Sequence, residues 1–161
     1  MISDWANQFK RQVLDSEYEL STEYIRSKKW YVRIIAGYMN PMIAEWVADA
    51  AKSTAGRLIG LAFGYQEDAE TTSLEKSADS IVKYMFDTSH CYSIITTELE
   101  EFVIYKDQAN RFLIFSGDRN FLSRAYRCSD DAVKQMFDWW VDGDDDEDDL
   151  RRVWRKYMGN E

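Results

Sequence analysis

The chain has 161 residues, 45 % of them hydrophobic and 15 % aromatic, which is a length typical of one domain and a composition that excludes a disordered protein. Its formal net charge is −9, but seven acids lie between Asp142 and Asp149, so the rest of the chain carries only −2 (−9 minus −7). This local acidity argues against nucleic acid as a partner, because phosphate contacts need a clustered basic face. It favours a cationic protein surface instead.

Cysteine usage and hydropathy bear on the compartment. Cys91 and Cys128 are too few for a disulfide framework, so we expect reduced thiols. The N-terminal residues lack the basic-then-apolar order of a signal peptide. The longest strongly apolar stretch, residues 58–65, is less than half of the roughly 20 residues that a membrane span needs. We therefore expect one cytoplasmic domain covering residues 1–161, with no membrane contact.

Helical periodicity dominates the first sixty residues. After a helix start at Ser3 and Asp4, apolar residues recur at helical spacing and predict one long helix that reaches Ile25. Residues 30–38 fit a helix, which we favour, but also tolerate a buried strand. Asn40 followed by Pro41 predicts a helix that ends near Gly56, because Asn caps free amides and Pro loses no bond at the first helical position.

The next stretch combines an unresolved and a clear pattern. Gly56, Gly60 and Gly64 recur every fourth residue, which on a helix makes a groove for close backbone packing and in a strand weakens it, so both geometries stay open. Thr72 and Glu75 form a capping-box pattern that predicts a helix through Met85.

From about residue 94 the apolar pattern becomes typical of β-strands. Residues 102–105 and 112–115 are apolar on both faces, so we expect central strands that are covered by helices, with residues 121–127 as a third strand. Ser129 then caps a helix, and a last helix follows the acidic run. The predicted class is α+β: a helix-rich N-terminal half, a short antiparallel sheet at about residues 94–127 and two C-terminal helices.

The stripes of the two C-terminal helices can be read from the same periodicity. The first is expected to bury Ala132, Val133, Met136, Phe137 and Trp140. The second is expected to turn Leu150, Val153, Trp154 and Tyr157 inward and Arg151, Arg152, Arg155 and Lys156 outward.

The acidic run has two interpretations. Glu147 with Arg151 and Asp148 with Arg152 have the spacing of helix-stabilising ion pairs. The acids before that helix either form a solvated flexible loop or a docking surface for a cationic partner. Trp139 either widens the core or supplies the desolvated anchor that a docking surface needs. The candidate partner-binding set is Asp142, Asp144, Asp145, Asp146 and Trp139.

Metal and catalytic readings find little support in the sequence. The alternating acids after residue 141 do not make an EF-hand, because Glu147 and Val153 occupy the positions that require Gly and an acid. His90 and Cys91 read as a turn histidine and a buried thiol. Glu98, Glu100 and Glu101 could place two carboxylates on one face, but no substrate-binding motif accompanies them. No cofactor and no metal are expected.

The small size, the helices before strands at Glu100 to Tyr105 and Phe112 to Phe115, and the acidic run resemble the immunity proteins of bacterial contact-dependent inhibition and related polymorphic toxin systems. The resemblance implies a cytoplasmic inhibitor that binds one cognate toxin, in many cases a nuclease, whose basic cleft an acidic surface would block. The alternatives are a small enzyme of unknown reaction and a self-associating structural protein that uses the glycine groove.

Overall fold

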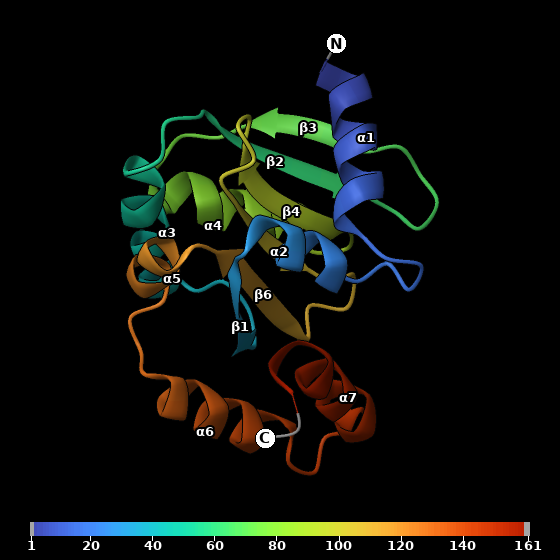
Figure 1. Cartoon of the computed structure of the whole chain (residues 1–161), viewed down its shortest axis with the longest axis vertical. Coiled ribbons are helices and arrows are strands. Elements are labelled where there is room, and N and C mark those ends of the chain that lie inside the picture. The colour runs from blue at the N-terminus through green and yellow to red at the C-terminus, as the bar shows by residue number, and fades with distance from the viewer. Residues whose placement is uncertain (1, 160–161) are drawn as a thin grey trace.

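The computed structural model describes residues 2–159, which form an α+β fold built on a six-stranded antiparallel sheet with strand order β1-β6-β5-β4-β2-β3 (Figure 1). The strands are β1 (Tyr31–Ala36), β2 (Leu58–Phe63), β3 (Glu70–Ser73), β4 (Tyr92–Thr97), β5 (Phe102–Lys106) and β6 (Phe112–Gly117). The helices are α1 (Ile2–Val13), α2 (Thr22–Lys28), α3 (Pro41–Lys52), α4 (Ala78–Asp87), α5 (Arg119–Ala125), α6 (Asp130–Val141) and α7 (Glu147–Met158). Among residues 2–159, no helix has both the length and the apolar character that crossing a membrane requires.

Helices cover both faces of the sheet. On one face the hydroxyl of Tyr105 donates to the backbone oxygen of Tyr18, in the turn between α1 and α2, at 2.6 Å. On the other face the ring of Tyr84, from α4, lies against the backbone of Gly60. β5 and β6 are buried along their whole lengths, as their apolar sequences predicted. α6 packs beside β1, at the edge of the sheet.

The long N-terminal helix predicted from the apolar stripe is wrong. α1 ends at Val13, and α2 begins only at Thr22. Between them the carboxylate of Asp15 accepts hydrogen bonds from the backbone amides of Glu17 and Glu19, and Tyr18 adopts a positive φ of 60°. The apolar spacing in the sequence does not reveal this break, because Leu14 and Tyr18 of the turn also pack against the core.

The helix favoured for residues 30–38 is also wrong, because this segment is β1. It pairs antiparallel with β6 from Tyr31 opposite Gly117 to Ala36 opposite Phe112. The glycine-rich segment, left open by the sequence, forms β2 around Gly60. The capping box at Thr72 is wrong as well: Thr72 lies in β3, and Ser77 caps α4 by accepting from the amide of Ser80.

These corrections change the predicted arrangement but not the class. Three strands lie in the N-terminal half, so the sheet extends over residues 31–117 and not only 94–127. The proposed third strand at residues 121–127 is wrong: Asp118 accepts a hydrogen bond from the amide of Phe121 and starts α5 instead. The helices predicted after Asn40 and Ser129 are confirmed with their caps, and the last helix is confirmed as α7.

Candidate functional site

The outer face of α6 exposes large apolar side chains. The helix buries Val133, Phe137 and Val141 against the fold. Met136 and Trp140, predicted on the inner stripe, are 45 % and 49 % exposed, and Trp139 is 82 % exposed. The idea that Trp139 widens the core is therefore wrong, and the residue is free to contact another molecule.

The loop after β1 and helix α3 extend this apolar surface. The ring of Trp140 lies against Gly37, since a Cβ there would be 3.6 Å from the indole, and Tyr38 follows with its ring exposed. The hydroxyl of Tyr126 contacts the sulfur of Met136 at 3.7 Å, and its ring meets that of Trp46 edge-on. Met42 lies one turn before Trp46 on α3 and is exposed. We call this surface the aromatic patch; its members are Tyr38, Met42, Met136, Trp139 and Trp140.

The acidic residues follow the aromatic patch directly. Asp142 ends α6, and the loop to α7 is held by its own hydrogen bonds. The carboxylate of Asp144 accepts from the amide of Asp146 at 2.8 Å, and that of Glu147 accepts from the amide of Gly143 at 3.1 Å. The side chains of Asp142, Asp144, Asp145 and Asp146 are all exposed. The loop thus presents carboxylates at a defined position beside Trp139.

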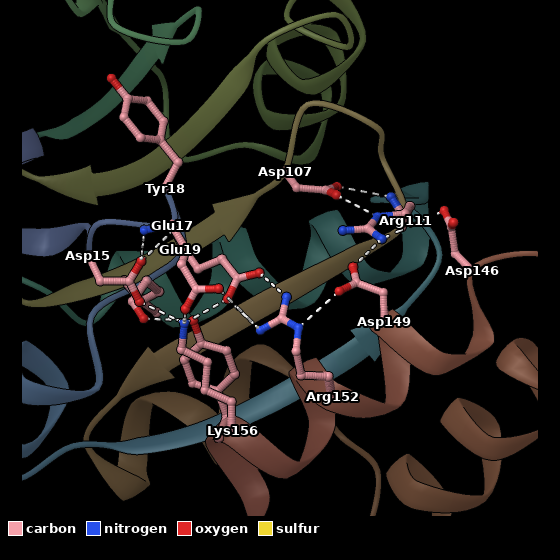
Figure 2. Close-up of polar contacts among 12 residues, drawn as sticks. Asp15, Glu17, Tyr18, Glu19, Asp107, Arg111, Asp146, Asp149, Arg152 and Lys156 are labelled. Carbon is pink, nitrogen blue, oxygen red and sulfur yellow. Dashed lines mark hydrogen bonds and ion pairs between the residues drawn. The ribbon is translucent and has the colours of Figure 1, made fainter.

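The far end of the acidic run is anchored to the fold through Arg111 (Figure 2). Its guanidinium lies 2.8 Å from Asp149, 3.7 Å from Asp146 and 2.8 Å from Asp107. Burial alone would lower the pKa of Arg111, but the hydrogen bonds and charges of Asp149 and Asp107 raise it. Asp146 is therefore partly neutralised by the chain itself, whereas Asp142, Asp144 and Asp145 have no ion-pair partner within residues 2–159.

The ion pairs predicted within α7 are half right. Glu147 and Arg151 form the expected pair at 2.7 Å. The pair between Asp148 and Arg152 is wrong, because Arg152 turns to Asp149 at 2.9 Å and to Glu19 at 2.7 Å. The outward orientation expected for Arg152 is wrong for the same reason.

An acidic cluster that the sequence did not single out lies at the turn before α2. The carboxylates of Asp15, Glu17 and Glu19 approach one another closely enough to hold a metal ion. The ammonium of Lys156 already lies between them, at 2.7, 3.5 and 2.6 Å (Figure 2). The cation of this cluster is thus a lysine of the same chain, and the expected outward orientation of Lys156 is wrong.

The glutamates considered for catalysis each have a partner elsewhere. Glu98 pairs with Arg57 at 3.0 Å. Glu100 accepts hydrogen bonds from the indole of Trp5 at 3.1 Å and the hydroxyl of Tyr24 at 3.3 Å. Glu101 accepts from the backbone amides of residues 55 and 56 at 3.0 Å and so stabilises the bend before β2.

His90 does not join these glutamates. It lies in an exposed turn before β4, as the sequence predicted, whereas the glutamates follow the end of β4. A six-residue strand spans about 20 Å, so the imidazole and the carboxylates do not converge on one pocket. Cys91, expected to be buried, is only partly buried.

The glycine groove proposed for self-association is filled. A Cβ at Gly60 would meet the ring of Tyr84 at 2.3 Å, so this glycine accommodates an aromatic side chain of the same chain. A Cβ at Gly64 would meet the carboxylate of Glu67 at 2.9 Å. At Gly60 and Gly64 the space beside the backbone is therefore taken by side chains of the same chain.

A cleft of about 720 Å³ that the sequence did not predict borders β1. Its walls come from α2, α5, α6 and α7, and it includes Arg26, Tyr31 and Arg119. No local pattern marks these residues, because the sheet topology alone brings segments nearly a hundred residues apart to one edge.

Comparisons with protein-family models, with curated proteins and with solved structures found no match. The site must therefore be interpreted from its own geometry.

Proposed function

We propose that the protein is a binding inhibitor that recognises a cationic protein through the aromatic patch and the adjacent acidic loop. The observation that carries this proposal is the 82 % exposure of Trp139, next to a loop that holds three carboxylates without an internal ion pair. Covering an exposed indole ring with a partner removes apolar surface from water and so lowers the free energy, and Trp is enriched among residues that dominate binding energy.

The two parts of this surface have different tasks. Screening limits the reach of the carboxylates to about 8 Å at physiological salt, so Asp142, Asp144 and Asp145 would steer the partner and set its association rate. The aromatic patch would supply the apolar area that keeps the complex together, and Met136 adds an adaptable side chain to it. Association and dissociation are therefore expected to respond to different substitutions.

The partner class follows from the resemblance to immunity proteins together with this charge arrangement. We infer that the partner is a cognate toxin domain, in the first instance a nuclease, encountered in the cytoplasm. Nucleases bind phosphates with clustered Lys and Arg, and the row of carboxylates on this loop would take the place of those phosphates. The inhibitor would then block the substrate surface without any catalytic step of its own.

The experiment begins by isolating the partner through affinity purification from the native host, with the full-length protein as bait. The triple variant Asp142→Asn, Asp144→Asn, Asp145→Asn should slow association at least tenfold at low salt and flatten its salt dependence. Trp139→Ala should raise the dissociation rate at least tenfold, with association nearly unchanged.

The matched control removes three exposed acids at the other end of the sheet: Asp68→Asn, Glu75→Gln and Asp79→Asn. Both triples change the net charge equally, so a local contact predicts a large effect for the first set only. Equal effects of the two triples would reduce the role of the loop to overall charge, and an unchanged dissociation rate in Trp139→Ala would exclude the aromatic patch.

A further inference from the structure

One edge of the sheet has an open backbone. Among residues 2–159, β1 pairs with β6 alone, and the amide of Gly37 continues this ladder by donating to the backbone oxygen of Arg111. Because hydrogen-bonded pairs alternate in an antiparallel ladder, residues 31, 33 and 35 bond to β6. The N–H and C=O groups of Val32, Ile34 and Ala36 therefore point away from the sheet. The same alternation, followed from strand to strand, predicts that Leu58 of β2 bonds toward β3. The amide of Leu74, just after β3, indeed donates to the backbone oxygen of Leu58.

Only the first half of this edge is accessible. α6 packs along β1, and Ile34 is fully buried. Residues 30–33 instead line the cleft of about 720 Å³, so the outward backbone groups of Val32 border an open space. An unpaired strand edge beside a groove is the geometry in which proteins add a peptide as an extra strand.

Free cations flank this stretch of backbone. Arg33 is committed to Asp130 at 3.0 Å, and Lys134 and Lys156 are paired with acids of their own neighbourhoods. Arg26 and Arg119 are exposed and have no carboxylate partner among residues 2–159, and against them the lining holds one acid without an ion pair among these residues, Asp131, so cations remain in excess. The guanidinium of Arg119 lies 4.7 Å above the ring of Tyr31 and donates to its hydroxyl at 3.1 Å, which holds it at the cleft.

The two arginines approach the edge from opposite faces of the sheet. Arg119 belongs to α5 and contacts Tyr31, whose side chain points to the α5 face. Arg26 belongs to α2, which lies on the α1 side, since the ring of Tyr24 packs edge-on against that of Phe9 at 6.1 Å. Side chains of an added strand would also alternate between these faces. Two acidic side chains an odd number of residues apart would thus reach both guanidinium groups.

We propose that this cleft binds an extended acidic peptide segment of a partner protein, which adds to β1 at Val32 and pairs with Arg26 and Arg119. The main-chain bonds give the orientation, and the arginines, which bind carboxylates in two-pronged fashion, select the acidic sequence. The site is separate from the aromatic patch and selects the opposite charge, so it does not depend on the function proposed above.

The test is a selection of random octapeptides displayed on phage against the full-length protein. Enriched peptides should carry acidic residues at an odd spacing. Their synthetic, fluorescein-labelled forms should bind at least tenfold more weakly to Arg26→Glu and to Arg119→Glu. Arg124→Glu is the matched control, because this exposed arginine of α5 does not line the cleft, and it should leave binding unchanged.

The backbone contact has its own readout. Bound peptide should slow hydrogen exchange at the amide of Val32 but leave that of Arg33, which already bonds to β6, unaffected. Val32→Pro should weaken peptide binding as well, since proline removes only the outward N–H at this edge position.

The proposal would be overturned by no enrichment of acidic peptides, by equal binding to the charge-reversed variants, or by no protection at Val32. Binding of inorganic phosphate at the same arginines with no peptide binding would also overturn it. None of these results would alter the association rates expected for the Asp142, Asp144 and Asp145 variants.

Discussion

Arg152 on α7 donates two hydrogen bonds to the carboxylate of Glu19, at 2.7 and 3.2 Å, across a sequence separation of 133 residues. Glu19 is only 8 % exposed, and Lys156 adds a third bond at 2.6 Å. A carboxylate that is this deeply buried is tolerated only because two cations surround it. The contact fastens the C-terminal helix to the turn between α1 and α2.

Glu19→Gln should therefore destabilise the protein by about 2 kcal/mol at pH 7, because it removes the buried charge that Arg152 and Lys156 share and leaves them only their pairs with Asp149 and Asp15. Urea unfolding of both proteins measures the difference. Glu23→Gln, a substitution of an exposed acid on α2, is the control and should cost less than about 0.5 kcal/mol. A similar loss in both variants would contradict the role assigned to Glu19.

The loss of stability caused by Glu19→Gln should depend on pH. Burial alone would raise the pKa of Glu19, but the hydrogen bonds and charges of Arg152 and Lys156 outweigh it and lower the pKa. Its stabilisation is therefore complete above the ordinary value of 4.5 and is lost as the pH falls through the lower value in the folded protein. The stability difference between the wild-type protein and Glu19→Gln should shrink below about pH 4. A constant difference down to pH 2 would show that charge is not its source.

Two buried tyrosines should respond in opposite ways to loss of the hydroxyl. The hydroxyl of Tyr84 is buried without a partner among the described residues, so Tyr84→Phe should be neutral or stabilise by up to about 1 kcal/mol. The hydroxyl of Tyr105 donates to Tyr18 at 2.6 Å, so Tyr105→Phe should cost about 1–2 kcal/mol. Thermal unfolding of the two variants checks the order, and a destabilised Tyr84→Phe would mean that its hydroxyl is satisfied in solution.

Two aromatic residues of α6, Phe137 and Trp139, should differ in how much their truncation destabilises the protein. Trp139→Ala should change the free energy of unfolding by less than about 0.5 kcal/mol, because the side chain is 82 % exposed. Phe137→Ala, at 1 % exposure, should cost about 3–5 kcal/mol. Chemical denaturation separates these outcomes. A large loss in Trp139→Ala would indicate that the indole serves the fold and not a partner.

Lys106 should lose its proton at an unusually low pH. Its ammonium is buried at the end of β5 and donates to the backbone oxygens of Cys91 at 2.6 Å and Asp107 at 3.0 Å. Burial lowers its pKa from 10.5 to about 8, although the charges of Asp107 and Cys91 oppose the shift. An NMR titration of the ¹³Cε resonance should show a midpoint near this value.

The unfolded chain keeps this proton to higher pH, so the unfolded state binds more protons between the two values. The stability of the wild-type protein relative to Lys106→Met should therefore rise as the pH increases from 8 to 10.5. A ¹³Cε midpoint near 10.5, or a flat difference in stability over this range, would contradict the prediction.

Local signals were sufficient for some elements of the fold. Asn40 followed by Pro41 and Ser129 followed by two acids place the caps of α3 and α6 correctly, because a cap is a contact between residues three apart. β5 and β6 were found because their apolar runs leave no polar face. The burial of β1 comes from β6, about eighty residues away, and no local pattern in residues 30–38 contains that information.

The candidate site shows the same division. The acidic loop and Trp139 could be recognised from the sequence, since an acidic run and a pair of neighbouring aromatic residues are evident without knowledge of the fold. It did not predict that Met136 and Trp140 would be exposed, because their helical spacing equals that of Phe137 and Val133, and only the docking of α6 decides which side of the stripe is covered. The cleft beside β1 could not be found either, since Arg26 and Arg119 share no local pattern.

The pairing of Tyr31 with Gly117 also has a consequence for biosynthesis. A ribosome must have released residue 117 before β1 finds its neighbour, and residue 152 before Glu19 meets its arginine. Residues 1–117 are therefore translated before the sheet closes at β1, and the nascent chain carries exposed apolar strands until then. We expect chaperone depletion to lower the yield of this protein more than that of a helical bundle of equal length.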